Sequence, residues 1–578
     1  MPTFRNAMTI TGSPKTLTPS RARLRGAALT VALSNALALP QIALAQSVPS
    51  AGGVLRETAP PPPPTIPPSP DVAPAPPAPQ PPSKAAPGGP AVTLTAIRFS
   101  GNMVFSSEEL QPLVAERIGQ PNTLADLEAL AMRVTEKYRN AGYMLAQAIV
   151  PVQDVSSGVV EISVVEGALG KVRFEIDPAA PVRPAVIERI ASRLKPGQPL
   201  HSRTLERVML LLSDLPGIAP QAALEPGEAS GTTDLIVVIA PLRRWDFSVD
   251  ADNHGSRSTG EFRVGVLGRI NSPLRLGDNL DARVQLGSGG GLSYGRLGYE
   301  LPLGGEGTRI GAAYSRLDYE LGKDFANLDG SGQADVFELT LTHPLIRARS
   351  RNLFGKIGWQ EKWLDDRLRG QESGKRIRSL NAGLAYEQRD RLLGGGYSSA
   401  SLTAFLGELR LDSETLRELD KSRQSEGHFE HWNYTVSRLN ALTGKMNLFF
   451  GITGQFADKN LDSAEKIALG GPRAVRAYAP SEATVDEGHV ANLELRYSLL
   501  PEVSLQGFYD WGWGRINRRP SAGDGKNDIS LRGYGLGAYW GGANGFALRT
   551  SVAWRATPRG SADADRVPRL YVQLTKFF

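Results

Sequence analysis

Cysteine is absent from this 578-residue chain, and histidine occurs only six times. Without thiols the chain can form neither disulfide bonds nor a thiolate metal site. The sequence also contains no phosphate-binding glycine loop, no paired-histidine zinc helix and no nucleophile elbow. We therefore expect a protein that is not an enzyme and that carries no cofactor and no metal ion.

Long apolar runs are also missing after the first 45 residues, where no stretch reaches the roughly 18 apolar residues that a spanning helix needs. The mean hydropathy of -0.23 is too polar for a bundle of such helices. A transmembrane β-barrel remains allowed, because its strands alternate lipid-facing and lumen-facing side chains. The net charge of +6 is spread along the chain, and we expect no binding of nucleic acid.

The first 45 residues have the pattern of a secretory signal peptide. Five basic residues precede an apolar run that begins at Gly26 and ends in small residues at Ala45. A membrane-anchoring helix is the alternative, but Pro40 and several polar residues interrupt the run. We therefore predict that residues 1–45 export the chain from the cytoplasm.

Residues 46–91 form a predicted proline-rich linker, in which Pro60 begins a run of five prolines. Such a segment has too few amide donors and too little apolar periodicity for a packed core, so it is typical of an extended, semi-rigid spacer. A docking ligand for a proline-binding module is the alternative. A short plug segment around Val54 at the start of the linker is left open, because so few residues cannot decide it.

Two α+β modules in tandem follow the linker. The first module, residues 92–167, is predicted to contain a strand at 92–99, a helix opened by the capping box Ser106–Glu109, a helix after Thr123 that ends at Gly142, and strands at 143–152 and 159–165. The second module, residues 168–242, is predicted to contain a strand at 172–176, helices at 182–194 and 202–212, and a closing strand at 235–240. Open sheet edges could bind an extended peptide by strand addition, with a plain spacer as the alternative.

From residue 243 to residue 578 the helical period gives way to strict alternation. In 280–286 and in 492–499 every second residue is apolar and the others are polar. We interpret this pattern as apolar side chains toward lipid and polar side chains toward a lumen, with a soluble sandwich as the alternative. The length suffices for a barrel of roughly 16 antiparallel strands. The last alternating strand ends in the aromatic Phe578, which we expect to close the barrel.

One segment, residues 327–338, has the glycine and the final glutamate of an EF-hand calcium loop at the required offsets. However, Asn327 stands where the first aspartate belongs, and strand patterns rather than helices flank the segment. We interpret it as a polar extracellular loop.

The order of signal peptide, proline-rich linker, paired modules and barrel resembles the transporter subunits of two-partner secretion systems. These TpsB-type proteins form the family of haemolysin and filamentous-haemagglutinin exporters, with ShlB, FhaC and HecB among them. The resemblance runs from about Val92 to Phe578. It identifies the paired modules as similar to polypeptide-transport-associated (POTRA) domains.

Two motifs carry the resemblance within the barrel. The segment Val475-Arg476-Ala477-Tyr478 resembles the family's Val-Arg-Gly-Tyr tip, which a long loop carries back into the lumen. Because Ala477 replaces the family's glycine, we expect that the backbone there does not rely on positive φ.

The partner motif of the family, Phe-x-Asp-x-Gly on the inner barrel wall, matches Phe508, Asp510 and Gly512. Strand alternation supports this placement, because a lipid-facing Tyr509 turns Asp510 toward the lumen. An arginine fork from Arg476 onto Asp510 would be a directional, charge-assisted contact that could pin the loop. An ordinary ion pair among many lumen charges is the alternative.

The resemblance implies a translocator in the outer membrane of a Gram-negative cell, with its POTRA domains in the periplasm. They would recognise an unfolded partner exoprotein, and the barrel would export it to the cell surface without ATP. The exoprotein would be a large adhesin, cytolysin or toxin. Further implied partners are outer-membrane lipid and, during biogenesis, the barrel-assembly machinery and periplasmic chaperones. The alternatives are a barrel-assembly insertase of the same superfamily and a diffusion or uptake channel.

Overall fold

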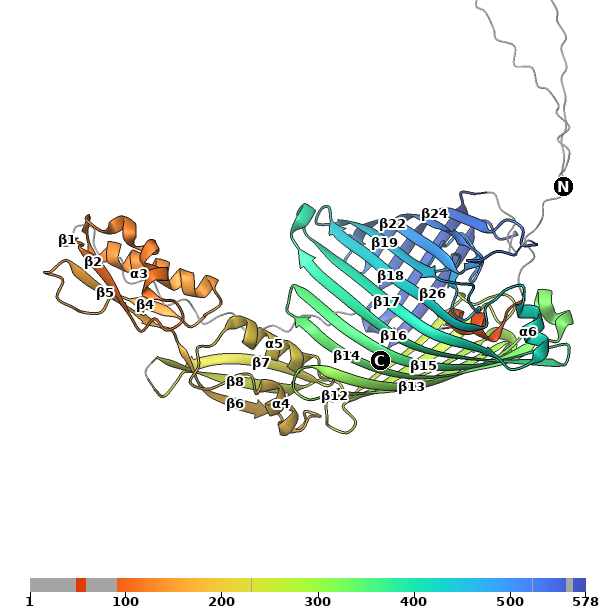
Figure 1. The fold of residues 1–578 in the computed structure, drawn as a ribbon, viewed down its shortest axis with the longest axis horizontal. Coiled ribbons are helices and arrows are strands. Elements are labelled where there is room, and N and C mark those ends of the chain that lie inside the picture. Colours follow the sequence, from red (N-terminus) through yellow and green to blue (C-terminus); the bar gives the residue numbers. More distant parts are fainter. Residues whose placement is uncertain (1–47, 59–90, 230, 522, 558–564) are drawn as a thin grey trace, which may run out of the picture. The chain divides into compact units, whose positions relative to one another are not determined.

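A computed structural model describes residues 48–58, 91–229, 231–521, 523–557 and 565–578 (Figure 1). The predicted signal peptide and the greater part of the predicted linker lie outside these residues. The described chain contains a short helix, α1 (Ala51–Thr58), two α+β modules and a barrel. The predicted fold class, two α+β modules followed by an antiparallel β-barrel of 16 strands, is confirmed.

The first module is a three-stranded sheet in the order β2-β5-β4, packed against a long helix. Its elements are β1 (Val92–Thr93), β2 (Ala96–Ser100), α2 (Ser107–Leu110), η1 (Gln111–Leu113), η2 (Ala115–Arg117), β3 (Pro121–Asn122), α3 (Leu124–Asn140), β4 (Gln147–Ile149) and β5 (Val159–Val165). The sequence sets both helix starts, because Ser106 and Thr123 each form a capping box. Helix α3 then buries Leu130, Val134 and Tyr138 against the sheet.

Two predicted strands of this module are shorter in the structure. The strand predicted at 92–99 is split into β1 and β2, and the strand predicted at 143–152 is reduced to β4. Residues before β4 form a turn instead, in which the amide of Tyr143 donates to the carbonyl of Tyr138 at 3.0 Å. After β4, Pro151 has no amide to donate to a ladder. Local turn chemistry therefore shortens the strand that alternation alone predicts.

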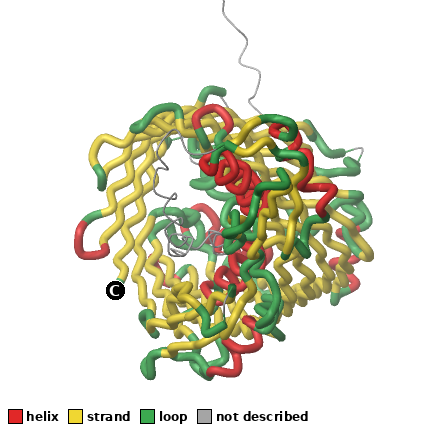
Figure 2. The backbone as a smooth tube through the Cα atoms, turned by 90° about the vertical axis from the view of Figure 1, so that its left-hand side faces the viewer, coloured by secondary structure: helices red, strands yellow, loops and turns green. Residues whose placement is uncertain are grey.

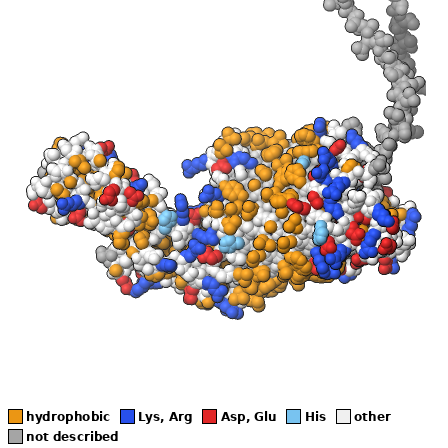
Figure 3. All heavy atoms as spheres, in the orientation of Figure 1, with side chains coloured by type: hydrophobic (Ala, Val, Ile, Leu, Met, Phe, Trp, Pro, Cys, Tyr) orange, Lys and Arg blue, Asp and Glu red, His pale blue; other side chains and the backbone are white. Residues whose placement is uncertain are grey.

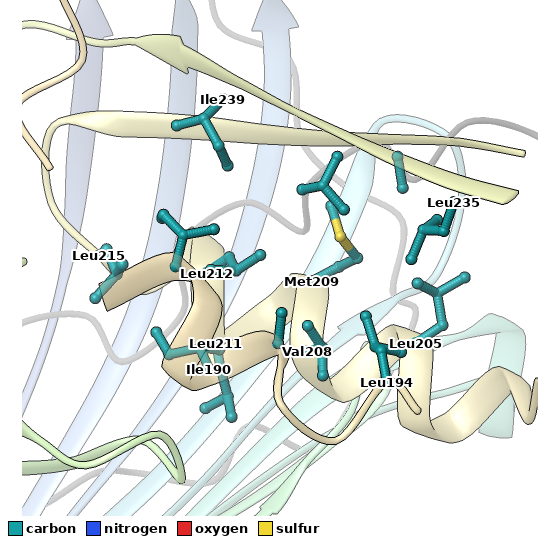
Figure 4. Packing of buried hydrophobic residues seen from close by; sticks show 14 of the residues in the cluster. Ile190, Leu194, Leu205, Val208, Met209, Leu211, Leu212, Leu215, Leu235 and Ile239 are labelled. Atoms are coloured by element: carbon teal, nitrogen blue, oxygen red, sulfur yellow. The ribbon is translucent and has the colours of Figure 1, made fainter. Parts of the chain in front are cut away.

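The second module repeats this order with a sheet β6-β8-β7. Its elements are β6 (Ala168–Ile176), α4 (Pro184–Ala191), α5 (Ser202–Ser213), β7 (Ile218–Pro226) and β8 (Thr232–Pro241). Figure 4 shows α5, with Leu205, Met209 and Leu212, lying against the sheet in which β8 carries Leu235 and Ile239. Strand β7 has no counterpart among the predicted strands. Its two prolines weaken the strand pattern, but an edge strand tolerates proline.

The barrel is closed by antiparallel neighbours from β9 to β26 (Figures 1 and 2). Its strands are β9 (Trp245–Asp252), β10 (Arg263–Asn271), β11 (Asn279–Gly287), β12 (Leu292–Leu303), β13 (Thr308–Glu320), β14 (Ser331–Arg347), β15 (Arg351–Leu368), β16 (Gln371–Asp390), β17 (Gly396–Leu411), β18 (Gly427–Ala441), β19 (Met446–Ala457), β22 (Glu487–Leu500), β23 (Val503–Arg515), β24 (Asp528–Gly541), β25 (Phe546–Arg555) and β26 (Arg569–Phe577). Between them lie η3 (Ser288–Gly290), η4 (Lys323–Leu328), η5 (Leu392–Gly394), α6 (Glu414–Asp420), β20 (Ile467–Ala468), β21 (Thr484–Val485) and η6 (Ala543–Gly545).

The barrel wall is apolar outside and polar inside, as the alternation requires. Leu297, Leu493 and Tyr509 are among its outward side chains, exposed by 55%, 47% and 43%. A band of hydrophobic side chains covers the barrel strands in Figure 3. Among the described residues, none of the helices combines the length and the apolar character that crossing a membrane would require.

The segment predicted as a polar loop, residues 327–338, is only partly a loop. It begins in η4, and from Ser331 onward it is strand β14, paired with β13. Ala334 and Val336 alternate inward there and are buried, which explains why the strand begins so early. The helix–loop–helix frame of an EF-hand is not formed by these residues.

Candidate functional site in the barrel lumen

The lumen loop, residues 458–486, connects β19 to β22 and carries the tip motif Val475-Arg476-Ala477-Tyr478. Strands β20 and β21 pair at its base, and the tip is fixed by backbone hydrogen bonds. The amide of Val475 donates to the carbonyl of Leu469 at 3.0 Å, and the amide of Tyr478 donates to the carbonyl of Val475 at 3.1 Å. All four side chains of the tip motif are buried. The loop therefore presents a folded tip to the barrel wall.

Arg476 of the tip binds Asp510 of β23 through three hydrogen bonds. Its Nε donates to Oδ2 at 2.8 Å, its Nη2 donates to Oδ1 at 2.7 Å, and its backbone amide donates to Oδ2 at 3.1 Å. Asp510 is fully buried and Arg476 is 7% exposed. Such a bidentate contact fixes both distance and orientation, because the planar guanidinium matches the carboxylate.

Further groups surround this pair. The Nη1 of Arg476 lies 2.8 Å from Oε1 of Glu494, and its guanidinium lies 3.5 Å from the centre of the Phe508 ring. The amide of Asn492 donates to Oδ1 of Asp510 at 2.7 Å and to the carbonyl of Ala474 at 3.2 Å. One cation therefore faces two carboxylates and an aromatic ring, and Asn492 fills the remaining lone pair of Asp510.

The remaining tip residues pack on the same wall. Gly512 leaves room for the loop, because a Cβ atom there would lie 3.0 Å from Cγ2 of Val475. The φ angle of Ala477 is not positive, so this position does not need glycine. The hydroxyl of Tyr478 donates to the carbonyl of Thr557 at 3.2 Å, and the hydroxyl of Tyr571 donates to the carbonyl of Tyr478 at 2.8 Å. We call this whole contact, between the tip motif and the wall residues Phe508, Asp510 and Gly512, the latch.

The last residue, Phe578, lies at the barrel seam. Its amide donates to the carbonyl of Phe247 at 2.9 Å, and the two rings lie 5.4 Å apart. Strands β26 and β9 are paired over only five residue pairs, from Gln573 with Asp252 to Phe577 with Ser248. The terminal aromatic residue thus extends a short closing ladder.

Helix α1, absent from the predicted elements, packs in the lumen against the loop. The amide of Ala51 donates to Oδ1 of Asp366 on β15 at 2.7 Å. Arg56 donates through Nη1 to the carbonyls of Ser463 and Lys466, at 2.7 and 3.0 Å. Ala51 and Val54 join a core cluster with inner-wall residues. In the sequence only a short run before the prolines indicates this helix, at the place where a plug segment is left open.

A polar cavity of about 340 Å³ adjoins the tip and the end of α1. Its lining includes Asp252, Arg263, Arg283, Gln506 and Arg549. Arg263 donates to Asp252 at 2.9 Å, and Arg283 donates to Asp250 at 3.3 Å. In the part of the chain that the structure describes, no cluster of three or more acidic or histidine side chains is arranged to hold a metal ion. The cavity therefore presents charged and polar side chains to the lumen.

Residues 231–540 match the family described as haemolysin secretion/activation protein ShlB/FhaC/HecB. The chain belongs to this family. Residues 92–167 match the ShlB-type POTRA domain. As a member of the ShlB/FhaC/HecB family, the chain is a TpsB-type outer-membrane transporter for secreted partner proteins, and its POTRA domains are periplasmic.

Curated relatives extend the similarity over most of the chain. The heme/hemopexin transporter protein HuxB of Haemophilus influenzae (strain 86-028NP) is 29% identical over 80% of this chain and 83% of its own length. The outer membrane transporter CdiB of Escherichia coli O6:K15:H31 (strain 536 / UPEC) is 26% identical over 84% of this chain and 79% of its own. Among solved structures, CdiB from Escherichia coli has a TM-score of 0.69 at 22% identity and covers 88% of this chain and 94% of that one. This last likeness shows the fold.

Proposed function

We propose that the chain recognises an unfolded partner exoprotein through its POTRA domains and exports it through the barrel without ATP. The matched family is described as haemolysin secretion/activation proteins, which supports a secreted protein as the partner. The observation that carries the proposal is the latch. A loop with a buried charged tip, bound to the inner wall by Arg476 and Asp510, is a closed state that a passenger can replace.

Strand addition is the proposed mode of recognition. The sheet orders β2-β5-β4 and β6-β8-β7 leave two edge strands in each module, and each edge carries backbone groups that an extended peptide can pair with. An unfolded exoprotein supplies such a peptide in the periplasm. Strand addition pairs with the backbone of the bound peptide more than with its side chains, so this mode suits a long passenger.

Transport requires the lumen loop and α1 to move. Both pack within the lumen, and α1 holds the loop through Arg56. Several contacts of the loop are polar, among them those of Arg56 and Arg476, so a passenger chain that supplies its own polar groups can take their place. We propose that Arg476 leaves Asp510 during export and returns afterwards.

The proposed energy source is folding of the passenger at the cell surface. The outer membrane has no ATP supply, and the sequence contains no phosphate-binding glycine loop. We also propose that the protein has no enzymatic activity. In this scheme the passenger diffuses through the pore, and its folding outside the cell prevents its return. The transporter then needs only a pore and a closed state that reforms.

Reconstitution tests this function directly. The full-length protein is placed in liposomes without nucleotide, and a urea-unfolded candidate exoprotein from the same organism is added outside. We expect the exoprotein to become protected from protease, and we expect Arg476→Ala to reduce this protection with the barrel still folded. Protection that appears only with ATP, or normal protection with the Arg476→Ala variant, would contradict the proposal.

Hydrogen exchange tests the recognition step on the full-length protein. Adding the amino-terminal region of the exoprotein should slow amide exchange along β2, β4, β6 or β7, the edge strands of the POTRA sheets. Protection confined to the helices or to the central strands β5 and β8 would exclude strand addition.

A further inference from the structure

Three glycines of the inner wall lie beneath the latch. Gly512 lies in β23, and Gly533 and Gly535 lie in the neighbouring β24. None of the three has a positive φ, so the backbone there would accept other residues. Glycine inside a strand weakens it, and it often marks a place where another part of the chain approaches closely. These glycines are therefore explained by space and not by conformation.

The space above two of them is taken by the loop tip. A Cβ atom at Gly533 would lie 2.6 Å from the Cβ of Ala477, and one at Gly512 would lie 3.0 Å from Cγ2 of Val475. Carbon atoms in contact normally lie about 3.5–4.0 Å apart. A methyl group at Gly533 therefore cannot coexist with Ala477 in its present place. Above Gly535 the ring of Phe508 occupies the equivalent space.

The two glycines flank Asp510 on the wall as Val475 and Ala477 flank Arg476 on the loop. Gly512 follows Asp510 by two residues on the same strand, and Gly533 is the cross-strand partner of Asp510. Strand alternation places these positions on one face. The wall thus offers a small residue on either side of a carboxylate, and the tip offers a short apolar side chain on either side of a guanidinium.

An ion pair alone does not set this register. Glu494 also lies within reach of Arg476, at 2.8 Å from Nη1, so charge would permit more than one placement of the tip. Packing discriminates between them, because a tip shifted by one strand would place a methyl group against larger side chains. Glu494 in β22 is the cross-strand partner of Phe508, so a tip shifted toward Glu494 would meet the ring of Phe508 instead of a glycine.

We propose that Gly533 is a positioning residue of the latch, which receives the Ala477 methyl group and thereby sets the register in which Arg476 meets Asp510. This inference rests on the proposed release of the lumen loop during export. It predicts that the summed size at positions 477 and 533 matters more than either residue alone. Adding a methyl group at position 533 should therefore weaken the latch, and removing the methyl group at position 477 in the same chain should restore it.

The test uses the full-length protein in detergent or liposomes, with a single reporter thiol. Because the chain has no cysteine, Ala479→Cys gives a unique thiol at a buried tip position. Its alkylation by a water-soluble maleimide is measured without passenger. We expect Gly533→Ala to raise the alkylation rate about tenfold or more, from the cost of overpacking. The double variant Ala477→Gly with Gly533→Ala should return most of the way to the parent rate.

Two further variants keep the test decisive. Gly295→Ala makes the same change in β12, where no atom lies within 4 Å of the new Cβ, and it should leave the rate unchanged. Ala477→Val enlarges the loop side and leaves the barrel strands intact, and it should raise the rate as Gly533→Ala does. A parent-like rate in Gly533→Ala, or no recovery in the double variant, would overturn the proposal. Since alkylation needs no passenger, failure of export alone would count against the proposed function and not against this register.

Discussion

Replacing Asp510 by asparagine should release the tip while preserving the shape of the wall. The carboxylate accepts two hydrogen bonds at Oδ2 and, at Oδ1, one from Arg476 and one from Asn492. An amide keeps one acceptor oxygen and turns an NH2 donor toward the other pair of donors. The latch therefore loses about two hydrogen bonds to a carboxylate, which corresponds to about 3 kcal/mol.

A loss of about 3 kcal/mol shifts the ratio of released to latched tips about a hundredfold. The substitution leaves the contact between Arg476 and Glu494, at 2.8 Å, in place. This contact is therefore not counted in the loss, and it limits the shift to about a hundredfold. The assay is alkylation of the Ala479→Cys reporter, whose rate follows the released fraction while release is rare. Export of the exoprotein is measured in parallel.

The matched control is Asp390→Asn. Asp390 also accepts a bidentate fork, from Nη1 and Nη2 of Arg438 at 2.9 Å each, and this pair joins the end of β16 to β18 instead of joining a loop to the wall. We expect the control to leave the reporter rate near the parent value. A parent-like rate in Asp510→Asn, with the barrel shown to be folded by its heat-dependent gel mobility, would refute the reasoning.

Three further predictions concern other parts of the chain. Arg56→Ala removes the hydrogen bonds that tie α1 to the loop, so we expect α1 to become accessible to protease several times faster, with a parent-like rate contradicting the tie. Thr123→Ala removes the cap of α3 and should cost about 1 kcal/mol in the exchange protection of that helix, whereas Thr123→Ser should not. Burial, with a hydrogen bond to Glu166, raises the pKa of Tyr138 above its usual value. Its stabilisation should be complete below about pH 10 and decline above it, and Tyr138→Phe should abolish that decline in a thermal melt.

Patterns of period two and period 3.6 were sufficient to predict the architecture. The outward Leu493 and the inward Asp510 follow from alternation alone, and the capping box at Thr123 marks the start of α3. The tip and wall motifs were found by resemblance, and alternation independently turned Asp510 inward. Such local signals work because each depends on a few neighbouring residues.

The features that could not be predicted depend on contacts between distant residues. Helix α1 is eight residues long, too short to be stable by itself, and it depends on partners such as Asp366 and the lumen loop. The edge strand β7 contains prolines that only its position in the sheet explains. The fit of Ala477 over Gly533 joins residues of a loop and a strand, and no local pattern indicates it. In the sequence, nothing distinguishes Glu494, the second carboxylate beside Arg476, from other lumen-facing charged residues.

Site-specific crosslinking to a stalled passenger tests the central claim most directly. A photoreactive residue is placed at Gln506, which lines the lumen cavity, or at the adjacent Leu505, which is 42% exposed on the outer face. The exoprotein is then arrested during export by a folded domain at its end. The account predicts adducts from position 506 and none from position 505. Equal adducts from both positions, or none from position 506 during arrested export, would contradict passage through the lumen.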